Sequence, residues 1–370
     1  MKARRLVCAL LFAAVLGGCA TAPPPMEPAD LYGPPEKPAP VASPSISAER
    51  MSEITRVLAS DEFQGRSMGT PGEEKTVAFL TEQFRAAGLE PGGENGGWTQ
   101  TVPLIRTKLQ VPMALSVKQG SRTLPLRFPD DLYLSTVRDT ERARIVNAPM
   151  VFVGYGVTAP ERGWDDFKGV DLKGKVAVFL VNDPDFEAAA GEPVAGKFGG
   201  QTMTYYGRWT YKFDEAARRG AIAALIVHDT PGAGYGWNVV QSAMGENFNI
   251  VLPTDAQQPV LLQGWIQGAV ADELFRRSGY ELAEMRRKAR TAEFRPVDLK
   301  ARFSADAGVE LNRITSRNVI GKLTGSKYPY ETVSYGGHWD AYGVGAPDAQ
   351  GRTIRPGAAD DALGLAAMIE

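Results

Sequence analysis

The chain has 370 residues, of which 44% are hydrophobic and 23% are charged, and its formal net charge is −2. This composition is that of a globular protein long enough for two domains with cores of their own. The near-neutral charge argues against a nucleic-acid-binding protein, which would carry a basic face or tail. No interior apolar run approaches the roughly 20 residues that a membrane-spanning helix needs.

The first 19 residues have the pattern of an export signal. The basic start MKARR is followed by the apolar segment LVCALLFAAVL, and the sequence LGGC at 16–19 resembles a bacterial lipobox. In lipoproteins of that kind the signal is cut before the cysteine, whose thiol receives lipid. We therefore expect lipidation at Cys19 and a location in the bacterial cell envelope, in the outer membrane facing the periplasm. An ordinary secretory signal, with release of the protein, is the alternative.

Cysteine usage agrees with export. The two cysteines are Cys8, which would leave with the signal, and Cys19, so the mature body has neither free thiol nor disulfide and must be stabilised by packing. Residues 20–45 contain nine prolines and almost no apolar side chains. This composition is typical of a disordered tether. We expect the membrane to be contacted only through the N-terminal lipid.

Residues 46–138 begin the folded body with two predicted helices. One face of the first helix collects four apolar residues, Met51, Ile54, Val57 and Leu58. Thr70 and Glu73 have the spacing of a capping box, and Pro71 stands at the first helical position, so the second helix is expected to begin there. Gly88 should end it. A glycine-rich loop and a strand follow.

Residues 139–295 have a different sequence pattern, with short apolar segments and glycine-rich connections, and are expected to form an α/β unit of their own. Short apolar and β-branched segments at 148–157, 175–181 and 221–227 predict buried strands, and 211–220 predicts a helix. The connections are rich in glycine, but none has the pattern of a phosphate-binding loop. We therefore expect no nucleotide site here.

Residues 296–370 return to longer elements. Strict alternation at 297–305 predicts a half-buried strand, and 317–325 and 331–338 predict two more strands separated by a short turn. The sequence DDALGLAAMIE at 360–370 has the composition of a helix. No internal repeat is present.

One of the two histidines, His338, falls where a predicted strand ends and a glycine-rich loop begins. Residues i and i+2 of an extended chain point to the same side, so Asp340 can accept a hydrogen bond from one ring nitrogen while the other binds metal. Twenty residues later, a carboxylate at Asp360 or Asp361 can bridge two metal ions about 3.5–4 Å apart. A loop after a strand often carries such a pair without metal, and Asp360 also suits a helix N-cap. His228 follows a buried strand and is expected to be structural.

A family resemblance covers nearly all of the folded body. The sequences YGGHWDAYG at 335–343 and GAADDALGLAAMIE at 357–370 resemble the first half of the metal site in the co-catalytic zinc aminopeptidases, metallopeptidase family twenty-eight. Residues 59–93 are similar to that family's N-terminal helical region, and 139–295 look like an inserted protease-associated domain. The resemblance implies an α/β fold of the zinc-exopeptidase type, with a mixed sheet flanked by helices, here incomplete.

Carried over by position, the family's site implies specific roles. His338 ligates one zinc, Asp340 orients His338 as a catalytic positioning residue, and Asp360 bridges two zinc ions. Asp361 follows in the turn that directs the bridge, and Leu363 stands where the family usually has serine. The remaining ligands and the glutamate general base lie further downstream in the family, so the resemblance implies a C-terminally truncated peptidase.

The implied activity is that of a metallo-exopeptidase of the aminopeptidase type. A water activated by two zinc ions would attack the N-terminal bond of a peptide or protein substrate. This chain carries only half of such a site, so we expect it to have little activity alone. Two alternatives remain: a non-catalytic, surface-anchored peptide-binding protein of the same fold, and the glutaminyl-cyclase branch, which is not expected to carry the inserted domain.

Overall fold

The computed structural model describes residues 46–348 and 350–370. The signal peptide, Cys19 and the tether predicted for residues 1–45 lie outside the described residues, so the lipid anchor stays a prediction. Residues Ser47–Glu370 group into one unit by their internal contacts. Within this part of the chain, no helix is both long enough and apolar enough to span a bilayer.

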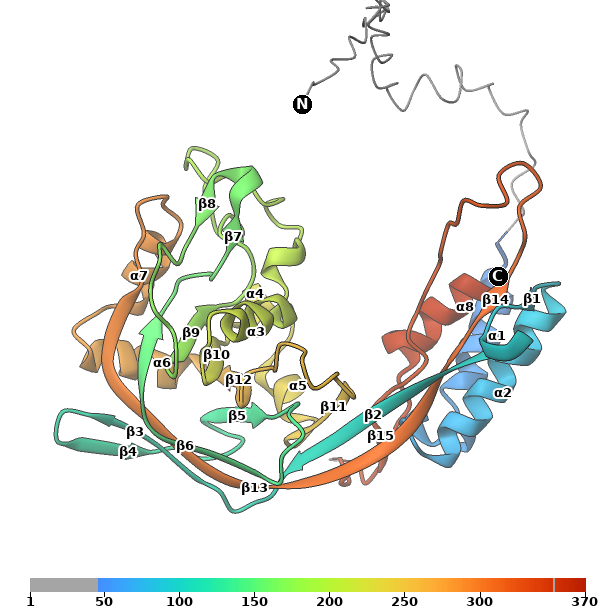
Figure 1. Cartoon of the computed structure of the whole chain (residues 1–370), viewed down its shortest axis with the longest axis horizontal. Helices are drawn as coiled ribbons and strands as arrows, with labels where there is room; N and C mark the ends of the chain where they lie inside the picture. Colours follow the sequence, from blue (N-terminus) through green and yellow to red (C-terminus); the bar gives the residue numbers. More distant parts are fainter. Residues whose placement is uncertain (1–45, 349) are drawn as a thin grey trace, which may run out of the picture. The chain divides into compact units, whose positions relative to one another are not determined.

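The described chain is mixed α/β, as the sequence predicts, with helices flanking a mixed sheet (Figure 1). The α-helices are α1 (Ala48–Leu58), α2 (Pro71–Ala86), α3 (Trp209–Arg218), α4 (Thr230–Ala233), α5 (Trp237–Gln241), α6 (Gly268–Arg277), α7 (Leu282–Ala289) and α8 (Leu363–Ile369). The strands of the large sheet are β2 (Thr99–Leu109), β3 (Ala114–Gln119), β4 (Arg122–Pro125), β5 (Leu132–Ser135), β6 (Arg142–Phe152), β9 (Val176–Leu180), β10 (Ala223–Val227), β11 (Glu246–Ile250), β12 (Leu262–Ile266) and β13 (Val297–Val319). Short strand pairs join β1 (Glu90–Pro91) to β14 (Gly321–Lys322), β7 (Thr158–Ala159) to β8 (Trp164–Asp165), and β15 (Gly343–Val344) to β16 (Ile354–Arg355).

The large sheet runs in the order β11-β2-β13-β6-β9-β10-β12-β5, and β3 and β4 are attached beside β13. Its centre is parallel, because β6, β9, β10 and β12 are parallel neighbours, and its outer strands pair antiparallel. Every residue of β9 and β10 is buried. Near-continuous apolar runs are typical of parallel strands covered on both faces.

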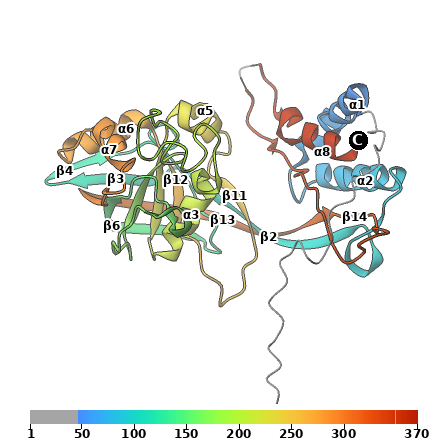
Figure 2. The same ribbon diagram turned by 90° about the horizontal axis from the view of Figure 1, so that it is seen from above.

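Helices cover both faces of this parallel centre (Figure 2). On one face, Phe275 of α6 and Met285 of α7 pack in the same apolar cluster as Val178 of β9. On the other face, Phe213 of α3 packs in the same apolar cluster as Phe179 of β9. The predicted strands at 175–181 and 221–227 and the predicted helix at 211–220 therefore share one core.

Strands from both sides of the boundary predicted at residue 139 contribute to this sheet. β3, β4 and β5 precede the boundary, yet β3 pairs with β13 and β5 pairs with β12. β11 also pairs with β2. The segment predicted as an insert therefore shares a sheet with its flanking strands.

Two strand predictions near the C-terminus need correction. Segments 297–305 and 317–325 are not two separate strands, because β13 contains the first and continues to Val319 in the second, pairing first with β6 and β3 and then with β2 (Figure 1). After Val319 only the short strand β14 follows. The predicted strand at 331–338 is irregular, and Val333 and Tyr335 are 79% and 84% exposed. No described strand lies hydrogen-bonded to it, and an alternating pattern does not make a strand without such a partner.

The two predicted N-terminal helices are present and pack with α8. Ile54 and Leu58 of α1 are buried against Leu365 and Ala366 of α8. The capping box predicted for α2 is absent, because the Thr70 side chain donates to Ser67 O instead of capping the helix. The Glu73 carboxylate accepts from Gly69 N at 2.6 Å and from Ser316 Oγ and Arg317 N of β13 at 3.1 Å. Glu73 therefore joins α2 to β13, which local spacing does not reveal.

Candidate metal site

Two separate backbone segments bring the predicted site residues together. His338 and Asp340 lie in the irregular segment after β14, and Asp360 lies in the single turn at 358–362 that precedes α8. Gly337 allows the segment of His338 to lie close to the turn that holds Asp360 and Asp361, because a Cβ at Gly337 would lie 3.2 Å from Asp361 Oδ2. Asp361 Oδ1 in turn accepts from Gly364 N at 3.1 Å, at the start of α8. The peptide bond between the two aspartates is cis.

The His338 ring lies between two carboxylates. Its Nε2 is 3.0 Å from Asp360 Oδ1, and its Nδ1 is 3.3 Å from Asp340 Oδ1 and 3.1 Å from Asp340 O. Two ligand atoms each about 2.0 Å from a tetrahedral zinc lie roughly 3.3 Å apart. The spacing between Nε2 and Oδ1 is therefore close to that of a shared zinc ion, and Asp340 faces the other ring nitrogen.

The charges around His338 favour a cation at this point. Burial acts to lower the pKa of His338, but the carboxylates of Asp340, Asp360 and Asp361 outweigh it and hold the pKa above its ordinary value. The three side chains His338, Asp340 and Asp360 are 53%, 38% and 68% exposed, so solvent and ions reach them. A proton on the ring and a metal ion at Nε2 compete for the same negative potential.

Arg66 supports both site segments and was not singled out from the sequence. It is fully buried, and its guanidinium donates to Trp339 O at 2.7 Å, to Pro356 O at 2.7 Å and to Gly357 O at 2.8 Å. Burial lowers its pKa, while the aspartates of the site raise it. The signal in the sequence is slight: a single arginine in a turn-rich segment has no spacing that points to the site.

The side chains at the site are of the types that bind zinc, but they are fewer than a catalytic zinc needs. Imidazole nitrogen and carboxylate oxygen are common zinc ligands, yet a catalytic zinc has three protein ligands. Among the described residues, no group of three or more histidine, cysteine, aspartate or glutamate side chains is placed to hold a metal ion. His338 and Asp360 therefore fit zinc as part of a ligand set, with Asp340 behind the histidine.

His228 lies in a different environment. It is only 6% exposed, its Nε2 lies 3.1 Å from Tyr235 O, and its ring packs against Trp237 and Trp265 at 5.4 and 5.8 Å between centroids. Burial lowers its pKa. Its surroundings are those of a packed aromatic cluster.

One family model and several solved structures match the chain. The sequence model of peptidase family M28 matches residues 318–370. An aminopeptidase structure from Aneurinibacillus sp. strain AM-1 is 21% identical, with a TM-score of 0.38, over 88% of this chain and 57% of that one. A zinc aminopeptidase from Bacillus subtilis is 15% identical, with a TM-score of 0.33, over 88% and 56%. A peptidase M28 precursor from Shewanella amazonensis SB2B is 16% identical, with a TM-score of 0.36, over 87% and 63%.

No curated protein sequence matches the chain. The alignments cover 56% to 63% of the length of the three solved structures. The family match falls on the segment that holds the candidate site. Residues 318–370 therefore match the model of peptidase family M28, and His338, Asp340 and Asp360 all lie within that segment.

Proposed function

We propose that this protein is a zinc-dependent exopeptidase of the aminopeptidase type, in which His338 and Asp360 hold zinc. The observation that carries the proposal is the 3.0 Å distance between His338 Nε2 and Asp360 Oδ1, in a segment that matches a peptidase family. An imidazole and a carboxylate at this spacing suit a metal that prefers nitrogen and oxygen ligands. The substrate class we propose is a peptide or protein with a free N-terminus.

Each residue has a separate task in this proposal. His338 binds through Nε2, because Nδ1 faces Asp340 at 3.3 Å. Asp340 fixes the tautomer and orientation of the ring and raises the basicity of Nε2. Zinc, when bound, lowers the pKa of a coordinated water to about 7 and polarises the carbonyl under attack. Arg66 keeps the segments of His338 and Asp360 in register through its bonds to Trp339 O and Gly357 O.

We also propose that the full site takes two zinc ions bridged by Asp360, whose side chain is 68% exposed. The 370-residue chain alone should hydrolyse amino-acid anilides slowly or not at all, since its described residues supply fewer donors than a catalytic zinc needs. Anilide turnover at a rate typical of enzymes, abolished in His338→Ala, would contradict this expectation.

The location and the insert are further proposals. The sequence before residue 46 supports lipidation at Cys19 and attachment to the outer membrane on the periplasmic side. We also propose that residues 139–295 form a protease-associated domain, because their sequence resembles one. Incorporation of labelled palmitate into the wild type but not into Cys19→Ala tests the anchor, and equal labelling of the two would exclude it.

Zinc binding tests the central proposal without requiring activity. Equilibrium dialysis of the metal-free chain against zinc should show binding that His338→Ala and Asp360→Asn both abolish. Asp340→Asn should weaken binding by about 10- to 100-fold, the usual cost of losing the carboxylate behind a histidine ligand. His228→Gln is the matched control, because it removes the other histidine and should leave zinc binding unchanged. Equal binding by the wild type and both ligand variants would overturn the proposal.

A further inference from the structure

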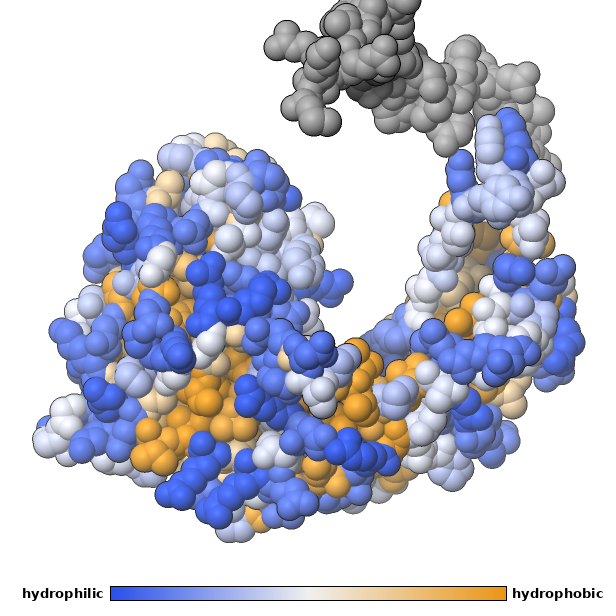
Figure 3. Space-filling model, in the orientation of Figure 1, coloured by the Kyte–Doolittle hydropathy of each residue, from blue (hydrophilic) through white to orange (hydrophobic). Residues whose placement is uncertain are grey.

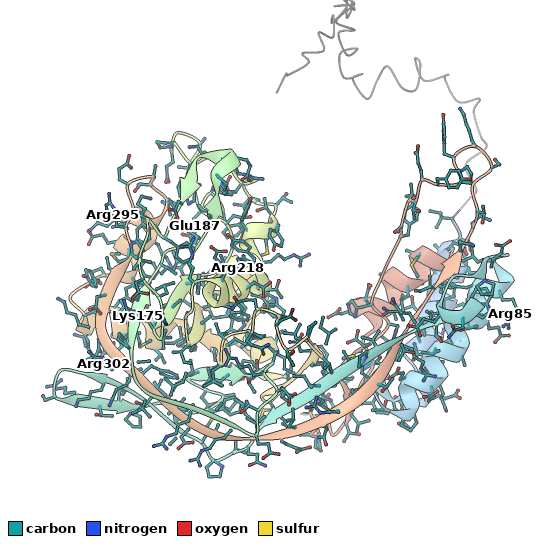
Figure 4. The ribbon with its side chains drawn as sticks, in the orientation of Figure 1. Arg85, Lys175, Glu187, Arg218, Arg295 and Arg302 are labelled. Atoms are coloured by element: carbon teal, nitrogen blue, oxygen red, sulfur yellow. The ribbon has the colours of Figure 1, made fainter. Side chains whose placement is uncertain are left out.

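A basic pocket lies on the solvent face of the sheet where β3, β6 and β13 meet. Its volume is about 480 Å³, and its lining is Lys118, Gly120, Asn147, Lys300 and Arg302. Three of these five residues are cationic and none is acidic. Leu299, Ala301 and Phe303 of β13 are buried in the core, so the alternating residues Lys300 and Arg302 face solvent. Arg302 is labelled in Figure 4, and the surface along β13 mixes hydrophilic and hydrophobic areas in Figure 3.

The strand register places like charges opposite each other in this pocket. Arg302 of β13 is the direct partner of Lys118 of β3, and Lys300 lies two residues away on the same face. Like charges at directly opposite positions destabilise a sheet. In the part of the chain that the structure describes, none of these three cations is in an ion pair, whereas Arg142 on the same face pairs with Asp306 at 2.8 Å.

The acidic residue closest to Lys300 in sequence, Asp298, is hydrogen-bonded to the backbone. Asp298 precedes Lys300 by two residues, and its Oδ1 accepts from the Lys300 backbone N at 2.7 Å. That bond joins the Asp298 side chain to the backbone of Lys300 and does not involve the Lys300 ammonium. Among the described residues, the three cations of the pocket therefore lack an ion-paired carboxylate.

Two residues of the pocket also have a backbone conformation that side chains disfavour. Lys300 and Asn147 have φ angles of +50° and +51°, in the left-handed region. They accompany register shifts between β13 and β6, at which the strands bulge. Arg302 Nη1 donates to Asn147 O at 3.2 Å, which draws the guanidinium toward the bulge. Bulges redirect side chains, and strained residues gather where a site requires them.

We propose that this pocket binds a phosphate group, either as free phosphate or as the headgroup of an anionic phospholipid. A phosphate group offers several acceptor oxygens around its negative charge, and it would offset the repulsion within the opposed pair Lys118 and Arg302. The planar guanidinium of Arg302 can donate two hydrogen bonds to phosphate oxygens, and the lysines add point charges. This site is separate from His338 and Asp360 and does not depend on the proposed peptidase activity.

Titration calorimetry with inorganic phosphate at low ionic strength tests the pocket in the full chain. Binding to the wild type should weaken by at least about tenfold in the double variant Lys118→Gln/Arg302→Gln, because charge-assisted hydrogen bonds are lost. Lys173→Gln is the matched control: it removes one exposed cation elsewhere and should leave the affinity unchanged. Equal affinity of the wild type and the double variant, or no binding to either, would overturn the proposal.

Vesicle flotation distinguishes the two sources of phosphate. Binding to phosphatidylglycerol vesicles but not to phosphatidylcholine vesicles, lost in the double variant, assigns the lipid headgroup. Binding of inorganic phosphate without flotation assigns the free anion. Lys118→Glu tests whether misfolding, and not loss of charge, accounts for lost phosphate binding. Its carboxylate faces Arg302, so the melting temperature should rise while phosphate binding is lost. A Lys118→Glu protein that retains phosphate binding would contradict the assignment.

Discussion

Replacement of Arg66 by methionine should loosen the candidate metal site while leaving the large sheet intact. The side chain is fully buried and donates to four carbonyl oxygens, those of Leu58, Trp339, Pro356 and Gly357, at 2.6 to 2.8 Å. Methionine retains most of the apolar stem and removes all of these donors. The segments before and after His338 and Asp360 would then lose their common attachment.

The magnitude follows from the kind of bond that is lost. A hydrogen bond to a charged group contributes about 1.5–3 kcal/mol, and four such bonds on one side chain are not additive. Removing one partner from a buried charged network costs about 3–5 kcal/mol. We therefore expect the free energy of local opening at the site to fall by about 3–5 kcal/mol, which corresponds to at least about a hundredfold in the opening equilibrium.

Amide hydrogen exchange measures this effect directly. The amides of Ala341 and Ala362 are reporters, because they donate to Arg66 O and Gly357 O at 3.2 Å. Both should exchange at least about a hundredfold faster in Arg66→Met. Amides of β10 should keep their protection, and Arg56→Met, on the exposed side of α1, should leave all of these rates unchanged. Unchanged exchange at Ala341 and Ala362 would refute the supporting role of Arg66.

Three further predictions concern other parts of the chain. Burial raises the pKa of Asp166 from 3.8 to about 7, so between these pH values the folded state binds one more proton than the unfolded state. The melting temperature should therefore fall as the pH rises from about 4 to about 7, and Asp166→Asn should remove this pH dependence. Gly357→Ala should cost about 1–3 kcal/mol and weaken zinc binding, because the residue has a φ of +59° and its Cβ would lie 2.5 Å from a neighbouring methyl group. Gly351→Ala, at a φ of +77° with open space, should cost only the backbone strain and leave zinc binding unchanged. Glu73→Ala should cost about 1–3 kcal/mol in urea unfolding by leaving donors of β13 unpaired, whereas Glu74→Ala, at an exposed carboxylate, should cost under about 0.5 kcal/mol.

The sequence predicts best those elements whose burial follows from their own pattern. The all-apolar, β-branched runs of β9 and β10 are typical of strands covered on both faces, and the apolar stripe of α1 is typical of a helix packed on a core. The alternation of apolar and polar residues does not show where one strand ends and the next begins, or which strand it pairs with. β13 continues from one partner to the next because the pairing passes from β6 to β2 at Val309, which depends on distant segments.

The errors have a common physical origin in contacts between segments far apart in the chain. Thr70 and Glu73 have the spacing of a capping box, but Glu73 is 243 residues from Ser316 in sequence and bonds to it. Arg66 contacts Trp339 across 273 residues. Spacing and resemblance predict His338, Asp340 and Asp360 as candidate site residues, whereas Arg66, which bonds to backbone carbonyls beside them, has no local signature.

Zinc K-edge X-ray absorption on the zinc-loaded chain tests the central claim most directly. We predict scattering from one histidine imidazole together with oxygen neighbours at about 2.0–2.2 Å, and loss of the imidazole component in His338→Ala but not in His228→Gln. Imidazole scattering that persists in His338→Ala, or sulfur scattering at about 2.3 Å from the cysteines before residue 46, would contradict it.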